Sequence, residues 1–151
     1  MRIESFTDLE VWKLGHEFVV DIYKKTKDFP KQENYGLTSQ LRRSASSITA
    51  NIAEGFSRYS FKDKNRFYYN SRGSISESQN HILLSRDIGY ITSDEAEALF
   101  EKCNMIRRIL NGLIRSTENQ IDHPDRITHY PLRSPSKRIT HYPLRITNNH
   151  G

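Results

Sequence analysis

An apolar repeat near the end of the chain constrains its fold more than any other feature of the sequence. Small or apolar side chains recur there at spacings of three and four, at Ala96, Leu99, Cys103, Ile106, Leu110, Leu113 and Thr117. This spacing places all of them on one face of an α-helix and is typical of a seam between packed helices. Thr92 and Glu95 have the form of a capping box just before the repeat. The repeat therefore predicts a helix that belongs to a bundle.

Three further segments have helical periodicity. Residues 8–27 carry two adjacent stripes, one of Leu9, Trp12, His16, Val19 and Tyr23 and the other of Val11, Gly15, Phe18 and Ile22. Residues 37–58 carry one core face, formed by Leu37, Leu41, Ala45, Ile48 and Ile52. The third segment is predicted to begin after Ser60, which can cap it with Asp63, and to run to Gly89. Thr7 or Asp8 can cap the first helix.

The first 120 residues show neither the alternation of β-strands nor a Gly-rich phosphate loop. Three short connections between four long helices favour an all-α, antiparallel up-down-up-down four-helix bundle over residues 1–120. Residues 121–151 form a basic tail in which RITHYPLR occurs at 126–133 and again at 138–145. A proline in each copy and a low apolar content predict a disordered tail. This tail either has no function or is an arm that touches nucleic acid.

The bulk composition limits the cellular setting and the partners. A net charge of +5 and a pI near 9.4 permit an anionic partner such as nucleic acid without requiring one. The single cysteine, Cys103, excludes an intramolecular disulfide and fits a reducing compartment. We expect no membrane association, because no apolar run approaches about 18 residues. The N-terminus lacks the apolar region of a signal peptide, so we expect a cytoplasmic protein.

The segment QLRRSASSITANIAEGFSR, residues 40–58, is rich in small and polar residues that form helices poorly. Beside its apolar face runs a second stripe, made of Gln40, Arg43, Ser47, Asn51, Glu54 and Arg58. Small side chains allow a neighbouring helix to approach closely, and a polar stripe at that contact can exchange hydrogen bonds with it. We predict a structural polar stripe of Arg43, Ser47, Asn51 and Glu54 that pairs with Ser74 and Glu77 of the third helix. The alternative is a stripe that simply faces solvent.

Four segments in order resemble one bacterial family: FTDLEVWKLGHE, FPKQENYGLTSQLRRSASSITANIAEGFSR, GSISES and DIGYI. They are similar to the four-helix-bundle proteins encoded in intervening sequences of 23S ribosomal RNA genes. The match covers nearly all of residues 3–118, and NIAEG lies in its most specific part. The resemblance implies a ring-shaped oligomer, a homopentamer. It also implies a distant relation to the accessory protein of diversity-generating retroelements, a basic pentamer that binds nucleic acid and a reverse transcriptase.

Three classes of function are open to such a chain. No Glu-x-x-His motif or Ser/His/Asp set is legible, so we expect no catalytic residue, no metal and no cofactor. Nucleic-acid binding is favoured by basic residues interleaved with aromatic ones between residues 58 and 72: Arg58, Lys62, Lys64, Arg66 and Arg72. Binding to RNA or DNA would follow phosphate charge and not base sequence. The alternative is a structural scaffold that recruits a protein partner and binds no nucleic acid.

Overall fold

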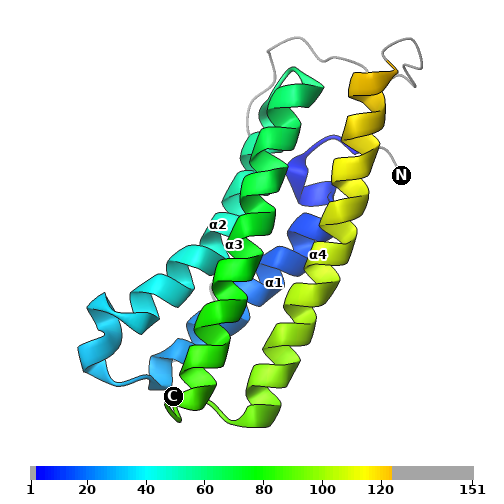
Figure 1. The fold of residues 1–151 in the computed structure, drawn as a ribbon. Helices are drawn as coiled ribbons and strands as arrows, with labels where there is room; N and C mark the ends of the chain where they lie inside the picture. Colours follow the sequence, from blue (N-terminus) through cyan, green and yellow to red (C-terminus); the bar gives the residue numbers. More distant parts are fainter. Residues whose placement is uncertain (1–2, 124–151) are drawn as a thin grey trace, which may run out of the picture.

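The computed structural model describes residues 3–123, which form four long helices joined by short turns (Figure 1). The helices are α1 (Glu10–Lys25), α2 (Leu37–Ser57), α3 (Phe61–Asp87) and α4 (Ser93–Asp122). Short 3₁₀ turns precede α1 and join it to α2, at η1 (Phe6–Asp8), η2 (Thr26–Asp28) and η3 (Lys31–Tyr35). Each helix packs against its neighbours in sequence, and α4 returns against α1. The predicted all-α, up-down-up-down four-helix bundle is confirmed.

Of the three side-chain caps that the sequence predicts, those of α3 and α4 form at the starts of their helices. Thr92 and Glu95 form the predicted capping box at α4, and Ser60 accepts the Asp63 N–H at the start of α3. The exception is α1, whose N-cap is Leu9 and has no side-chain hydrogen bond. Asp8 instead accepts the N–H groups of Glu4 and Ser5 at 2.9 Å each and closes a capping box on η1. These two hydrogen bonds lower the pKa of the Asp8 carboxyl.

The last helix extends beyond the boundary that the sequence predicts. α4 continues to Asp122, two residues past residue 120, so the first two residues of the predicted tail are helical. Its buried face also shifts near the end, from the predicted Leu113 to Ile114. A straight helix has 3.6 residues per turn, so a strict seven-residue repeat drifts off the buried face. The duplicated RITHYPLR segments lie outside the described residues.

The core runs along the axis of the bundle, and all four helices contribute to it. Its best-buried apolar side chains are Phe18, Ile22, Leu41, Ile48, Ile52, Ile75, Ile82, Ile106 and Leu110. The five residues predicted as the core face of α2 are all buried. On α1 the buried stripe is the one that contains Gly15, where an added Cβ would lie 3.0 Å from the Thr49 methyl carbon of α2. The other stripe is less buried: Leu9 belongs to the core, Trp12 and Val19 pack partly buried against it, and Tyr23 is 45% exposed.

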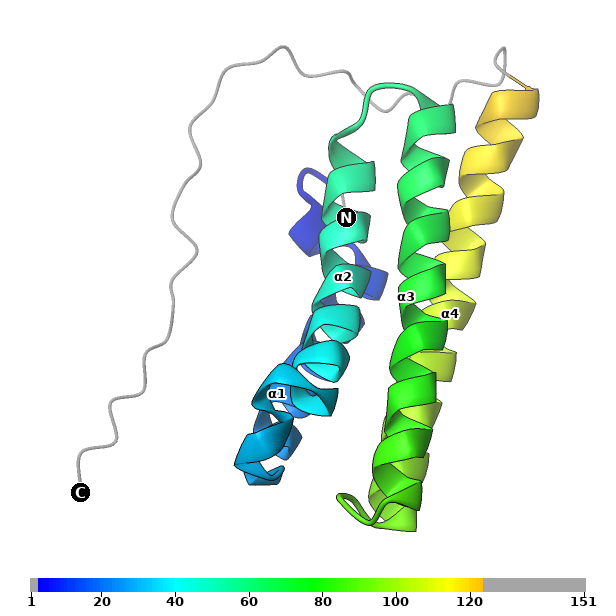
Figure 2. The ribbon, with the colours of Figure 1, turned by 60° about the vertical axis from the view of Figure 1, so that its left-hand side comes forward.

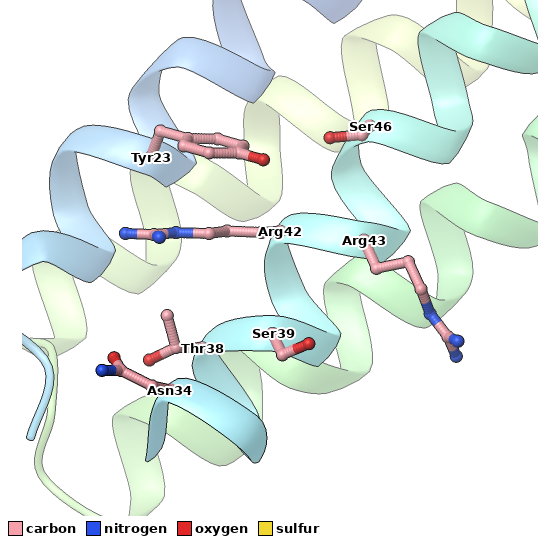
Figure 3. A pocket seen from close by; sticks show the side chains of 7 residues that line it. All are labelled: Tyr23, Asn34, Thr38, Ser39, Arg42, Arg43 and Ser46. Atoms are coloured by element: carbon pink, nitrogen blue, oxygen red, sulfur yellow. The ribbon is translucent and has the colours of Figure 1, made fainter. Parts of the chain in front are cut away.

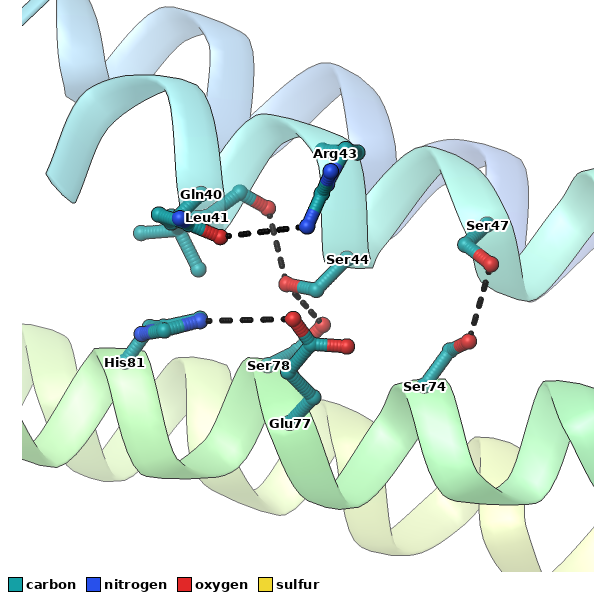
Figure 4. A network of polar contacts seen from close by, with 9 residues as sticks. All are labelled: Gln40, Leu41, Arg43, Ser44, Ser47, Ser74, Glu77, Ser78 and His81. Carbon is teal, nitrogen blue, oxygen red and sulfur yellow. Dashed lines mark hydrogen bonds and ion pairs between the residues drawn. The ribbon is translucent and has the colours of Figure 1, made fainter. Parts of the chain in front are cut away.

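The contact between α2 and α3 is lined by serines, as Figure 4 shows. Ser78 donates to Ser44 and Ser74 donates to Ser47, each at 2.9 Å between hydroxyl oxygens. Ser71 donates to the Ile48 carbonyl at 2.8 Å. We call these five serines the serine contact. Their small size lets the two helices lie close, and their hydroxyls are satisfied across the gap, so the unusual composition of residues 40–58 reflects close helix packing.

Between residues 3 and 123, no helix combines the length and the hydropathy needed to cross a bilayer.

Candidate nucleic-acid interface

Four of the five basic residues predicted to bind nucleic acid lie close in sequence to the turn between α2 and α3: Arg58, Lys62, Lys64 and Arg66. Figure 2 shows this turn at one end of the bundle. The guanidinium carbon of Arg58 lies 4.7 Å from the centre of the Phe67 ring, and that of Arg66 lies 5.2 Å from it. Arg58 also forms an ion pair with Glu54 one turn back on α2. Two guanidinium groups are therefore held over one aromatic ring, which orders them at modest cost because the cation–π contact is favourable.

Two exposed side chains extend this surface. Lys62 is exposed in the first turn of α3, and Tyr59, in the turn itself, is 82% exposed. The nearby Asp63 is engaged by the Ser60 hydroxyl at 3.0 Å. We call Arg58, Tyr59, Lys62, Arg66 and Phe67 the basic turn surface. It presents three cationic groups and an accessible aromatic ring on one end of the bundle.

Lys64 is placed differently from its neighbours. Its amine donates to the Phe56 carbonyl at 2.7 Å and lies 5.5 Å from the centre of the Phe56 ring. Burial lowers the pKa of this amine, because the charged form loses part of its hydration. The Lys64 amine therefore ties α3 to the end of α2, and its charge is turned toward the protein.

Arg72 lies further along α3, on the side that faces α4. Its guanidinium carbon lies 4.6 Å from the centre of the Tyr69 ring, and its Nη1 donates to Asn111 of α4 at 3.4 Å. Tyr69 in turn donates to Glu118 of α4, and this hydrogen bond raises the pKa of the phenol. Arg72 is thus separated from the basic turn surface by its tie to α4.

The predicted polar stripe is resolved into several local pairs (Figure 4). Of its members, only Ser47 and Ser74 join α2 to α3. Asn51 donates to the Ser47 carbonyl at 2.8 Å and to the Ser47 hydroxyl at 3.0 Å, so it supports this bridge from within α2.

The charged members of the stripe pair along their own helices. Arg43 donates to Gln40 at 3.4 Å, and Glu54 pairs with Arg58. Glu77 lies 3.6 Å from the Nε2 atom of His81. Their exposed positions leave these charges at the rim of the serine contact.

Sequence reasoning missed a group on the opposite side of α2. Arg42 reaches toward α1, where its guanidinium carbon lies 4.7 Å from the centre of the Tyr23 ring. Its Nε donates to the Thr26 hydroxyl at 2.7 Å. The sequence does contain a signal for this placement. On a helical wheel of α2, Arg42 and Arg43 flank the core face on opposite sides, so their side chains leave the helix in different directions.

The remaining reactive groups offer little for chemistry. Within residues 3–123, no three His, Cys, Asp or Glu side chains gather closely enough to hold a metal ion. Cys103 is buried in the core, and this burial raises the pKa of its thiol to about 12. A thiol with this pKa is not a nucleophile at neutral pH, because the reactive form is the thiolate.

Comparison with known proteins agrees with the bundle. The chain is similar to a crystal structure of a protein of unknown function from the S23 ribosomal protein family of Bacteroides thetaiotaomicron. The two share 26% identity with a TM-score of 0.63, over 70% of this chain and 98% of that one. No curated protein matches the chain. The model of the 23S rRNA-intervening sequence protein family matches residues 7–112, and the chain therefore belongs to that family.

Proposed function

We propose that this protein assembles into a homo-oligomer that binds RNA or DNA non-specifically through the phosphate backbone. The observation that carries the proposal is the basic turn surface, where Arg58 and Arg66 share the Phe67 ring beside the exposed Lys62. Guanidinium groups make charge-assisted hydrogen bonds with phosphate oxygens. Here they are already ordered by the ring, so less conformational freedom is lost when a phosphate arrives.

The exposed aromatic ring of the basic turn surface suits single-stranded nucleic acid. Tyr59 exposes most of its ring beside the cations, and every base offers a face that can stack on it. The arrangement provides backbone contacts and stacking, neither of which reads base sequence. We therefore expect little sequence preference and an affinity that falls steeply as salt rises.

Assembly would multiply this surface. Val20 of α1 is 38% exposed, and Leu84 of α3 and Ile88 at its C-cap are 45% and 47% exposed, so both regions carry apolar side chains that a second copy could cover. The family resemblance leads us to propose five subunits. A ring repeats the basic turn surface around its axis, and repeated weak contacts raise the apparent affinity through effective concentration.

The predicted residues would contribute unequally. Arg58, Lys62 and Arg66 would contact phosphates directly, and Arg72 would assist from the side that faces α4. Lys64 would act mainly by holding the turn, because its amine already donates to the Phe56 carbonyl. We propose no catalytic role for any of these residues and place the protein in the cytoplasm.

A second candidate function is a scaffold that recruits a protein partner, such as a reverse transcriptase, without binding nucleic acid. The observation that favours it is an apolar patch near the end of α3. Leu83, Leu84 and Ile88 are 36%, 45% and 47% exposed there, which would suit a protein surface better than a phosphate backbone.

The test is a titration of fluorescently labelled single-stranded RNA and duplex DNA with the full chain, at about 50 and 150 mM salt. Light scattering on the same samples gives the mass of the assembly, and we expect several times 17.7 kDa. The Lys62→Glu/Arg66→Glu variant should weaken binding. It should also lower the slope of log affinity against log salt by about one for each phosphate that is no longer neutralised.

A matched control separates local contacts from overall charge. Lys27→Glu/Lys31→Glu makes the same change in net charge with two exposed lysines at the other end of α2, and it should bind nearly as well as the parent. If the parent shows no binding near 50 mM salt, or both variants bind equally, the scaffold function takes the place of nucleic-acid binding. A monomer at micromolar concentration would contradict the assembly.

A further inference from the structure

The surface between the end of α1 and the start of α2 is hollowed into an open cleft of about 580 Å³ (Figure 3). Tyr23 of α1 forms one wall, and α2 forms the other with five side chains: Thr38, Ser39, Arg42, Arg43 and Ser46. Asn34 of η3 closes one end. The cleft lies at the opposite end of α2 from the basic turn surface, and no acidic side chain of the described chain lines it.

Arg42 is held in a fixed position within this cleft. Its Nε atom donates to the Thr26 hydroxyl at 2.7 Å, and that hydroxyl donates to the Ile22 carbonyl at 2.8 Å. The guanidinium plane lies against the Tyr23 ring. Within residues 3–123, the two terminal nitrogens of Arg42 make neither a hydrogen bond nor an ion pair. Its positive charge is thus ordered by two contacts, while the two-pronged edge that recognises oxyanions is left unused.

Thr38 supplies an independent indication of a ligand. The residue is 2% exposed, and its hydroxyl is buried without a hydrogen-bond partner in the described chain. Such buried unpaired groups are uncommon in native proteins and call for an explanation. Figure 3 shows the hydroxyl on the Asn34 side of the cleft, below the Arg42 guanidinium. An acceptor oxygen bound beside Arg42 would satisfy this hydroxyl.

We propose that this cleft, the Arg42 cleft, binds the phosphate group of a phosphate ester. The terminal nitrogens of Arg42 would hold two phosphate oxygens, and the Thr38 hydroxyl would donate to a third. A carboxylate fits less well, because a bidentate pair turns both of its oxygens toward the guanidinium, and it has no third oxygen to place at Thr38. The volume exceeds that of a phosphate, so it leaves room for the organic part of the ester.

The proposal does not depend on nucleic-acid binding at the basic turn surface. A free nucleotide and the terminal phosphate of an oligonucleotide offer the same chemistry to the Arg42 cleft. The probes for isothermal titration calorimetry on the full chain are therefore adenosine 5′-monophosphate, a 5′-phosphorylated tetranucleotide and the same tetranucleotide with a 5′-hydroxyl. Sodium acetate at equal ionic strength tests for a carboxylate. We expect the first probe to bind and acetate not to bind.

Three variants locate the binding. Arg42→Gln should weaken binding of adenosine 5′-monophosphate about tenfold or more, because it removes a charge-assisted pair of hydrogen bonds. Thr38→Val keeps the shape and removes only the hydroxyl, and it should weaken binding about tenfold without lowering the melting temperature. Arg108→Gln is the matched control, because Arg108 is exposed on α4 and does not line the cleft. It should change affinity by less than about twofold.

Each outcome decides a part of the proposal. If only the 5′-phosphorylated tetranucleotide binds, the phosphate recognised by the cleft belongs to the terminus of a nucleic acid. If adenosine 5′-monophosphate binds as well, the cleft is a nucleotide site. The proposal is overturned if neither binds at millimolar concentration, if acetate binds as tightly, or if Thr38→Val leaves the affinity unchanged. The Lys62→Glu/Arg66→Glu variant should leave binding of adenosine 5′-monophosphate intact, so failure at one surface is distinguishable from failure at the other.

Discussion

Gly55 is the position where a single methyl group should most clearly reveal how closely α2 and α3 pack. Replacing a glycine in the interior of a helix by alanine normally stabilises a protein by about 0.5–1 kcal/mol, because it restricts the unfolded chain. At Gly55 an added Cβ would lie 2.7 and 2.9 Å from two carbons of the Tyr68 ring and 3.0 Å from the Lys64 carbonyl oxygen. Ordinary contacts between carbon atoms are about 3.5–4.0 Å.

The neighbours of Gly55 have little freedom to move. Tyr68 is 2% exposed, so its ring is packed on all sides, and the Lys64 carbonyl belongs to the backbone of α3. Gly55→Ala would therefore push the two helices apart by several tenths of an ångström. Overpacking of this kind costs about 1–3 kcal/mol. When the gain in helix propensity is subtracted from the middle of this range, we expect a net loss of about 1 kcal/mol in the free energy of unfolding.

The controls are two glycines elsewhere in the bundle. An added Cβ at Gly73 of α3 or at Gly112 of α4 meets no atom within 4 Å. Gly73→Ala and Gly112→Ala should each gain about 0.5–1 kcal/mol, which corresponds to an increase of about 2–5 °C in melting temperature.

The assay is urea unfolding followed by circular dichroism at a fixed protomer concentration, because assembly makes apparent stability depend on concentration. A Gly55→Ala variant as stable as the parent, alongside stabilised controls, would refute the close approach of α2 to α3.

Two further predictions follow from the same contacts. Cys103 should react with a thiol reagent at pH 8 at least about a hundredfold more slowly in the native protein than in urea, because burial suppresses its thiolate; rapid native labelling would contradict its place in the core. Asn51→Leu should cost about 1–2 kcal/mol, because it removes two hydrogen bonds that support Ser47. Glu54→Leu should cost less than about 1 kcal/mol, because its pair with Arg58 is exposed. Thermal unfolding of both variants measures this order, and the reverse order would show that the stripe is arranged differently.

The sequence predicts the elements of this fold well because their determinants are local. The core face of α2 depends only on the spacing of Leu41, Ile48 and similar residues, and every predicted member is buried. The capping box of Thr92 and Glu95 needs only residues three apart, and it forms. At α1 the local rule is ambiguous, because two acceptable acceptors, Ser5 and Asp8, stand close together. They cap the 3₁₀ turn that precedes the helix.

The sequence predicts less well which face of a helix turns inward when both faces are apolar. On α1 the stripe with Gly15 is buried, whereas the stripe with the larger aromatic residues is only partly so: Trp12 packs against the edge of the core, and Tyr23 is 45% exposed. Burial favours the smaller residue here because α2 approaches so closely that a Cβ at Gly15 would press on Thr49. This preference depends on the distance between two helices. The periodicity of residues within one helix gives no information about that distance.

The partners of polar side chains are also difficult to predict from periodicity. Periodicity correctly places Ser47 and Asn51 on one stripe, but both longer polar residues, Asn51 and Glu54, find partners one turn away on their own helix. Neighbours at a spacing of four lie within about 5–6 Å on any helix, so they compete with partners across a contact. The short serine side chains, by contrast, bridge the gap between α2 and α3 through the pairs Ser74–Ser47 and Ser78–Ser44.

The adjacent residues Arg42 and Arg43 show why charge alone could not locate the candidate sites. They contribute equally to the net charge, yet they lie on opposite sides of the core face of α2. Arg42 is ordered by Thr26 and Tyr23 beside an unpaired threonine hydroxyl, whereas Arg43 donates to the exposed Gln40. The same distinction separates Arg58 and Arg66, which share an aromatic ring at the surface, from Lys64, whose amine donates to a carbonyl. A cation is a strong candidate for anion binding when its stem is fixed and some of its donors remain unused, and both conditions depend on neighbours that only the fold assembles.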